Sequence, residues 1–195
     1  MKEVLFVILD DFADWEYAPV AAAINRADGF FVKTVSLSKG AVKSIGGFHV
    51  LPDFDLTEAM GREFSGLVLI GGNSWRTEEA KQVEMLVNLA AKKNTVIGAI
   101  CDATVFLGRM GLLNGISHTS NELGSLQEFA GEKYTGAERY QLRQAVRDGN
   151  IVTANGTANM EFGKEVLLAL HAMKEEEAEQ WYRIYKLGYY EAMKN

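Results

Sequence analysis

The sequence has a single cysteine, Cys101, among its 195 residues. One cysteine excludes an intramolecular disulfide. No apolar run approaches the roughly 18 to 20 residues of a membrane-spanning helix. The apolar start, residues 1–9, meets Asp10 and Asp11 too soon for a secretory signal peptide. We therefore expect a cytoplasmic protein with no membrane partner.

Positive charge is also scarce. Lysine and arginine together number 20 against 26 acidic residues, which gives a formal net charge of −6 and an isoelectric point near 5.2. Nucleic acids and anionic membranes are bound by basic surfaces, which this composition does not favour. We expect no nucleic-acid partner, and a small neutral or cationic substrate fits this charge balance best.

Several binding motifs are absent as well. There is no Walker sequence and no G-x-G-x-x-G after a strand, so nothing favours a nucleotide site. No cluster has metal-ligand spacing. We therefore expect neither a cofactor nor a metal.

Alternating strands and helices dominate what is present. Continuous apolar runs at residues 4–9, 67–70 and 95–100 are typical of strands buried on both faces of a parallel sheet, and apolar residues at helical spacing follow each run. The remaining expected elements are a strand at 31–37, an edge hairpin at 42–51, a brief strand at 116–119, a helix at 122–130, a hairpin at 144–154 and a helix at 161–173. The order predicts a three-layer α/β/α sandwich with a mostly parallel sheet, forming one domain over residues 1–174.

Residues 175–195 differ in composition, with three acids followed by an aromatic stripe. This pattern predicts an added amphipathic helix. Its apolar face packs either on the same domain or at a subunit interface.

Cys101 stands where an apolar strand changes into a helix without an intervening loop. Such a sharp turn presents its central side chain at the carboxyl edge of the sheet, as a nucleophile elbow does. The opening N–H groups of a helix favour an anion, so we expect a lowered thiol pKa and a large thiolate fraction at neutral pH. The alternative is a small buried hydrophobic residue, the usual role of a lone cysteine.

Ligands of open α/β sheets bind beyond the carboxyl ends of the strands, so residues just after each strand are candidates. Glu16 follows the first strand and, if buried beside Cys101, would act as an activator or proton shuttle; alternatively it is a solvated acid at a helix start. Asp10, Asp11 and Asp14 are expected to be solvated acids that make the mouth of the site acidic.

Backbone N–H groups after the strand at 67–70 offer a second element of a catalytic site. The N–H groups of Gly72 and Asp102 could together form an oxyanion hole; the alternative is that the glycines form a plain turn into a helix. His118 lies closest in sequence to the cysteine and is nominated as a base, against a structural role. His49 and His171 are expected to be ordinary surface or packing residues.

The chain resembles the PfpI/ThiJ superfamily over nearly its whole length, from Glu3 to Met173. The resemblance rests on an ordered set of five segments: FADWEYAP, LVLIGGNSW, AICDATVFLGRMGLLNG, SHTSN and IVTANGTANMEFG. It implies a flavodoxin-like fold related to class I glutamine amidotransferases, a reactive elbow cysteine at Cys101, a partner acid at Glu16 and frequently a homodimer.

Two departures from relatives narrow the expected activity. Protease-like members carry histidine directly after the nucleophile, where this chain has Asp102, which argues against peptidase activity. Glutamine amidotransferases have glycine two residues after the cysteine, where this chain has Ala103. They also have a late His-x-Glu, whereas His171 of this chain is followed by Ala172 and Met173. We therefore do not expect glutamine hydrolysis.

The first hypothesis is thus a cysteine-dependent enzyme, of glyoxalase, deglycase or hydrolase type, acting on a small electrophilic carbonyl or amide substrate. The second is a stress-response redox sensor in which Cys101 is oxidised without turnover. An intracellular peptidase or amidase remains a further alternative. A flavodoxin-like electron carrier is disfavoured because the acidic loop after the first strand would repel a phosphate.

Overall fold

A seven-stranded sheet forms the centre of the molecule. The computed structural model describes residues 1–194, and its sheet has the strand order β5-β2-β1-β6-β7-β9-β8. The strands are β1 (Lys2–Val7), β2 (Phe30–Ser36), β5 (Phe54–Asp55), β6 (Gly66–Leu69), β7 (Val96–Ile100), β8 (Ala145–Asp148) and β9 (Ile151–Ala154). All neighbouring pairs are parallel except β8 with β9.

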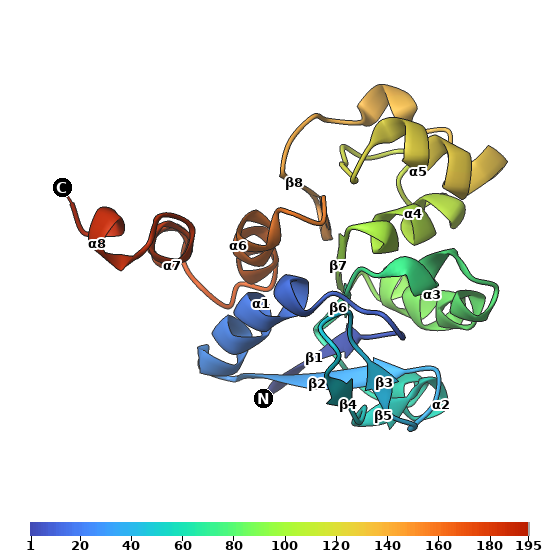
Figure 1. Cartoon of the computed structure of the whole chain (residues 1–195), viewed down its shortest axis with the longest axis horizontal. Helices are drawn as coiled ribbons and strands as arrows, with labels where there is room; N and C mark the ends of the chain where they lie inside the picture. Colours follow the sequence, from blue (N-terminus) through green and yellow to red (C-terminus); the bar gives the residue numbers. More distant parts are fainter. Residues whose placement is uncertain (195) are drawn as a thin grey trace.

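Helices cover both faces of this sheet (Figure 1). On one side lie α1 (Asp14–Arg26) and α6 (Asn159–Ala169). On the other lie α2 (Leu56–Met60), α3 (Glu84–Lys92), α4 (Asp102–Arg109) and α5 (Leu123–Ala130). Short 3₁₀ helices complete the chain: η1 (Asn73–Arg76), η2 (Glu79–Val83), η3 (Gly131–Lys133) and η4 (Ala137–Arg139). The predicted flavodoxin-like α/β/α sandwich is confirmed.

The core divides into two clusters because alternate side chains of each strand point to opposite faces. Val4, Phe6 and Ile8 pack against α1 and α6, whereas Leu5 and Val7 pack toward α3 and α4. All five are at most 2% exposed. This two-sided burial explains the continuous apolar run in the sequence.

One expected strand is absent, and one expected hairpin lies elsewhere than at the sheet edge. Residues 116–119 form no strand, and only an isolated bridge joins His118 to Tyr140. The expected hairpin exists as β3 (Val42–Lys43) and β4 (His49–Val50), but it forms a separate two-stranded sheet. The sheet edge is instead β5, a two-residue strand too short for the period-2 pattern to reveal. The predicted hairpin at 144–154 is confirmed as β8 and β9.

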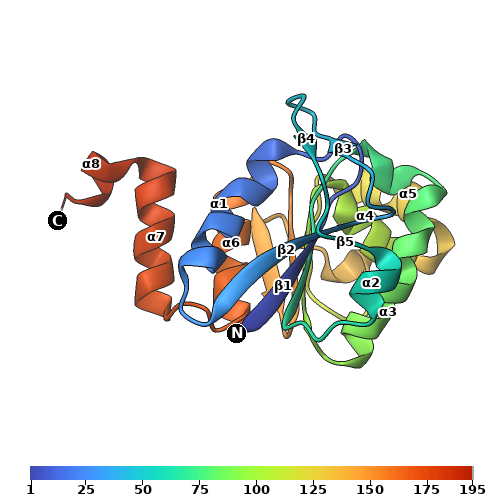
Figure 2. The same ribbon diagram turned by 90° about the horizontal axis from the view of Figure 1, so that it is seen from below.

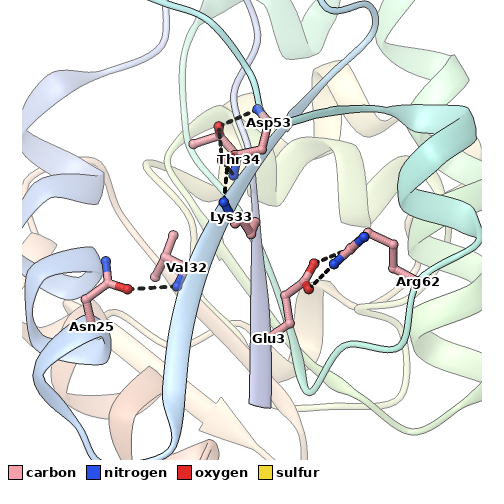
Figure 3. A network of polar contacts seen from close by, with 7 residues as sticks. All are labelled: Glu3, Asn25, Val32, Lys33, Thr34, Asp53 and Arg62. Atoms are coloured by element: carbon pink, nitrogen blue, oxygen red, sulfur yellow. Dashed lines mark hydrogen bonds and ion pairs between the residues drawn. The ribbon is translucent and has the colours of Figure 1, made fainter. Parts of the chain in front are cut away.

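Polar side chains fix the edge of the sheet (Figure 3). The carboxylate of Asp53 accepts hydrogen bonds from the Thr34 N–H (2.8 Å), the Thr34 hydroxyl (2.9 Å) and Lys33 Nζ (2.8 Å), which ties the segment before β5 to β2. Glu3 accepts two hydrogen bonds of 2.6 Å from Arg62, so the loop between α2 and β6 is held against β1. These contacts lie away from the elbow and serve the fold.

The C-terminal helix lies outside the three layers (Figure 2). α7 (Glu175–Leu187) contacts α6, and α8 (Tyr189–Ala192) follows after Gly188, whose φ of 87° ends α7. Ala178 is fully buried and Trp181 packs against Gly163 of α6, while Tyr190 is 84% exposed. The last residue of the expected 175–195 helix lies outside the described residues. No helix within residues 1–194 has the length and hydrophobicity to span a membrane.

Candidate active site

Cys101 occupies the predicted turn between β7 and α4. Its backbone has φ 59° and ψ −132°, a conformation that costs an L-residue energy and persists only where the surroundings enforce it. The Cys101 N–H donates to Ala154 O of β9 at 3.0 Å, and Cys101 O accepts from the Thr104 N–H at 3.0 Å. Two neighbouring elements therefore hold the elbow. The strand–turn–helix prediction is confirmed.

Glu16 lies beside this elbow. It stands in the first turn of α1 and its side chain is fully buried. Oε2 accepts a hydrogen bond of 2.8 Å from the Gly71 N–H, whereas Oε1 has no hydrogen-bond partner within residues 1–194. A β-carbon added at Gly156 would lie 3.1 Å from this oxygen and 3.0 Å from Sγ of Cys101. The carboxyl group and the sulfur thus border the same small space.

Burial sets the protonation of both groups. Desolvation raises the pKa of Glu16 to about 7, against smaller lowering effects of the Gly71 N–H and the Cys101 side chain. Desolvation, followed by the negative charge of Glu16, raises the pKa of the Cys101 thiol to about 11. The thiolate expected from the helix N-terminus is therefore a wrong prediction: the sulfur is a neutral thiol at pH 7 next to a carboxyl that titrates there.

Sequence reasoning missed Asn121, which contacts the sulfur, and Gly156, which borders the same space. Asn121 Nδ2 donates to Sγ of Cys101 at 3.2 Å, and Asn121 Oδ1 accepts from the Gly156 N–H at 2.8 Å. The carbonyl of Gly156 accepts a hydrogen bond of 2.8 Å from the Trp15 indole, so this loop is held on both sides of the site. Both missed residues lie in segments that carried the family resemblance, SHTSN and IVTANGTANMEFG.

Glycine is required where β6 approaches the elbow. A β-carbon at Gly71 would overlap the β-carbon of Cys101 and the carboxylate of Glu16. Gly72 has a φ of 152°, and a β-carbon there would overlap the carbonyl oxygen of Asp11. Only glycine lets this loop come so close to the site.

The two expected oxyanion donors open neighbouring helices. Gly72 immediately precedes η1, and its N–H has no acceptor within residues 1–194. Asp102 opens α4, and its N–H interacts with the Cys101 sulfur. The Asp102 side chain is buried and paired with Arg76, at 2.6 Å from Nε to Oδ2 and 2.9 Å from Nη2 to Oδ1.

His118 is not brought to the cysteine. Its ring is fully buried, with Nδ1 hydrogen-bonded to Ile116 O at 2.8 Å and Nε2 to the Tyr134 hydroxyl at 2.7 Å. Desolvation lowers the pKa of His118, so the ring is neutral. The nomination as base is corrected to a structural role, because sequence proximity does not determine ring orientation. His49 and His171 are exposed, as expected.

The acidic residues of the first loop also tie the β3–β4 hairpin to the site. Asp10 Oδ1 accepts from the Lys43 N–H at 2.9 Å, and Asp14 Oδ2 accepts from the Gly46 N–H at 2.6 Å. Asp11 is exposed, as expected of a solvated acid. The hairpin therefore folds over the acidic loop rather than extending the main sheet.

Beyond the ends of β1 and β2 there is a pocket of about 350 Å³. Its lining includes Asp10, Ser36, Ser74 and Glu79 and contains no lysine or arginine. An anionic group such as a phosphate would be repelled there. Within residues 1–194 no group of three or more histidine, cysteine or acidic side chains could hold a metal ion.

Known proteins share this architecture. The model of the DJ-1/PfpI family matches residues 2–169. The Bacillus subtilis (strain 168) protein named Uncharacterized protease YdeA is 40% identical over 190 residues, covering 97% of this chain and 94% of that protein. The thiJ/pfpI family protein from Bacillus anthracis has a TM-score of 0.90 at 32% identity, covering 98% of this chain and 93% of its own. The DJ-1 superfamily protein Atu0886 from Agrobacterium tumefaciens has a TM-score of 0.86 at 32% identity, covering 96% and 98%.

Proposed function

Because the chain belongs to the DJ-1/PfpI family, we propose that it is a cysteine-dependent enzyme acting on the carbonyl carbon of a small molecule. The observation that carries the proposal is the buried carboxyl of Glu16, which keeps one oxygen without a hydrogen bond next to the sulfur of Cys101. An unsatisfied buried acceptor is costly for folding, and a task in accepting the thiol proton would account for this one.

Proton transfer comes first in the proposed reaction. The Cys101 thiol is neutral at rest, so its proton moves to Oε1 of Glu16 as the sulfur forms a bond to the carbonyl carbon. A general base is most effective when its pKa lies near the working pH, and the Glu16 pKa of about 7 meets this condition. Asn121 donates a hydrogen bond to the sulfur and stabilises the developing thiolate.

The carbonyl oxygen then carries the displaced electron pair. We assign the N–H groups of Gly72 and Asp102 to this oxyanion. The Asp102 N–H, which interacts with the sulfur at rest, turns to the oxygen once the sulfur is bonded to carbon. Each such donor contributes about 2.7 to 4 kcal/mol in the transition state. With an aldehyde, the oxyanion takes the proton from Glu16 and gives a hemithioacetal. With an amide, the proton goes to the leaving amine and water later cleaves the thioester.

The relatives favour hydrolysis as one outcome. Two Bacillus subtilis (strain 168) proteins that match most of this chain are named as uncharacterized proteases. Asp102 is nevertheless bound to Arg76 and does not supply the histidine that protease-like members carry at this position. We therefore propose small aldehydes and amides as substrates before peptides.

The test compares wild type with Cys101→Ser and Cys101→Ala on a panel of short α-oxoaldehydes and small amides. Both variants should lose turnover while their circular dichroism and melting temperature stay close to wild type. Turnover that survives in Cys101→Ala would refute a role for the sulfur.

A redox sensor is the second candidate, because the one sulfur lies beside an acid and an amide donor. Sensing requires a thiolate, and the raised pKa of Cys101 makes this state rare at neutral pH. Intact-mass and peptide mass spectrometry after mild peroxide treatment would favour the sensor if oxidation were confined to Cys101 and no aldehyde or amide were turned over.

We further propose that the enzyme works as a homodimer, as the family resemblance implies, and in the cytoplasm, as expected from its sequence. Light scattering coupled to gel filtration measures the oligomeric state directly. A monomer at micromolar concentration would contradict it.

A further inference from the structure

We infer that Arg76 is a positioning residue that holds the two halves of the oxyanion site at a fixed distance. The inference rests on the proposed function, since it assigns a task to the N–H groups of Gly72 and Asp102. The Arg76 side chain hydrogen-bonds Asp102 and makes no hydrogen bond to Cys101 among the contacts of the described residues.

The placement of Arg76 in the chain is the first argument. Gly72 caps the N-terminus of η1, and Arg76 is the last residue of the same short helix. Asp102 follows the elbow as the first residue of α4. A contact between the side chains of Arg76 and Asp102 therefore joins η1, which begins after the Gly72 donor, to α4, which begins with the Asp102 donor.

The geometry of the ion pair is the second argument. Nε and Nη2 of Arg76 bind Oδ2 and Oδ1 of Asp102 at 2.6 and 2.9 Å, so the pair is bidentate. The Asp102 side chain is 5% exposed and that of Arg76 is 37% exposed. A planar fork on a buried carboxylate fixes orientation as well as distance, which an ammonium group cannot do.

Further contacts restrain both partners. The guanidinium carbon of Arg76 lies 4.0 Å from the ring centre of Phe129 in α5, so the free face of the fork is stacked. Asn121 Nδ2 lies 3.4 Å from Oδ1 of Asp102 and also donates to the Cys101 sulfur. Arg76 of η1 thus contacts both α4, through Asp102, and α5, through Phe129.

Arg76 also has a purely electrostatic effect, which must be separated from positioning. Its positive charge compensates Asp102, whose negative charge raises the pKa of Cys101. Arg76→Gln would remove charge and fork together and would leave a buried carboxylate alone. Arg76→Lys keeps the charge and loses only the fork, so it is the informative variant.

The experiment measures two properties of Cys101 in Arg76→Lys. The rate of alkylation by iodoacetamide between pH 6 and pH 11 reports the thiol alone. Protection against alkylation by butanal reports the hemithioacetal, in which sulfur adds to the carbonyl carbon and the proton ends on the oxygen. The N–H donors hydrogen-bond the oxygen of this adduct and no turnover is needed, so the protection stays measurable even if the proposed function fails.

We expect Arg76→Lys to keep the wild-type alkylation profile and to weaken butanal protection by about twofold to tenfold, since the neutral adduct loses an ordinary hydrogen bond to its oxygen. If a substrate is turned over, kcat falls and KM changes little. Arg109→Lys, the same change at the end of α4, is the matched control and should leave both properties unchanged. Wild-type protection in Arg76→Lys, or a parallel shift of both properties, overturns the inference.

If Arg76→Lys fails to fold, the double variant Arg76→Gln with Asp102→Asn gives the same test without a buried charge. An amide pair can keep one hydrogen bond but not the fork, so weakened butanal protection supports the inference and wild-type protection overturns it.

Discussion

Oε1 of Glu16 and Sγ of Cys101 border one point above Gly156, at 3.1 and 3.0 Å from the position that a β-carbon would occupy there. The acid comes from α1 and the sulfur from the turn after β7, on opposite sides of the neighbouring strand β6. Burial shifts the two pKa values in the same direction, to about 7 and about 11. At neutral pH the Cys101 sulfur therefore keeps its proton, and the ionised form of the Glu16 carboxyl can accept it.

The pH dependence of turnover follows from this pair. Catalysis needs an ionised Glu16, so kcat/KM should rise with pH through about 7 and reach a plateau before the thiol titrates. Initial rates between pH 5 and pH 9.5 measure the rise. An activity that is constant from pH 5 upward would mean that Glu16 is not the base.

Glu16→Gln should separate thiol reactivity from catalysis. Removing the negative charge lowers the pKa of the Cys101 thiol below its wild-type value of about 11, so alkylation by iodoacetamide at pH 9 becomes faster. Turnover becomes slower, because glutamine cannot accept the thiol proton. Asp11→Asn, a neutralised acid on the exposed part of the same loop, is the control; identical thiol pKa values in wild type and Glu16→Gln would place the acid away from the sulfur.

The same substitution should change stability in a pH-dependent way. The folded pKa of Glu16 is raised from 4.5 to about 7, so the folded state binds more protons than the unfolded state between these values. The free energy of unfolding therefore falls as pH rises through this window, by on the order of 3 kcal/mol at most. Glu16→Gln should be more stable than wild type at pH 8 and nearly equal to it at pH 4. Urea unfolding at both pH values tests the sign.

Gly156→Ala should block the site with little effect on folding. The added methyl group would stand between the sulfur and the carboxylate, while both backbone hydrogen bonds of residue 156 remain possible. Displacement of reacting groups by about 1 Å can lower kcat on the order of a hundredfold. Gly115→Ala has open space around its β-carbon and serves as control. Unchanged kcat in Gly156→Ala would show that proton transfer does not pass through this space.

His118→Gln distinguishes a structural histidine from a base. Glutamine can still hydrogen-bond to Ile116 and Tyr134 but cannot accept a proton from the thiol, so kcat and its pH profile should stay near wild type. A loss of stability of about 1 to 3 kcal/mol is expected from imperfect replacement of two buried hydrogen bonds. His171→Gln is the surface control. A folded variant with kcat reduced a hundredfold would restore His118 as a catalytic candidate.

The elbow and the partner acid could be predicted because each follows directly from the order of the chain. An apolar run that ends at Cys101 and continues as a helix predicts a sharp strand–turn–helix elbow. Glu16 follows another parallel strand, and the carboxyl ends of parallel strands lie at the same edge of the sheet. The C-terminal region was expected as one helix, and the break at Gly188 divides it into α7 and α8.

The remaining errors depend on loops that meet only in three dimensions. Asn121 and Gly156 are 35 residues apart and touch through one hydrogen bond, for which neither residue type gives a signal. The direction of the thiol pKa was mispredicted for the same reason. A helix N-terminus favours a thiolate that stays in contact with water, whereas burial of Cys101 and the negative charge of Glu16 beside it favour the neutral thiol.

The three tryptophans stand in three different parts of the structure, and this gives the protein a built-in set of optical probes. Trp15 is about half exposed and donates to the Gly156 carbonyl beside the sulfur, Trp75 is buried next to Phe106 of α4, and Trp181 lies between α6 and α7. Variants that retain one indole each would make fluorescence report site occupancy, core integrity and detachment of the C-terminal helix separately.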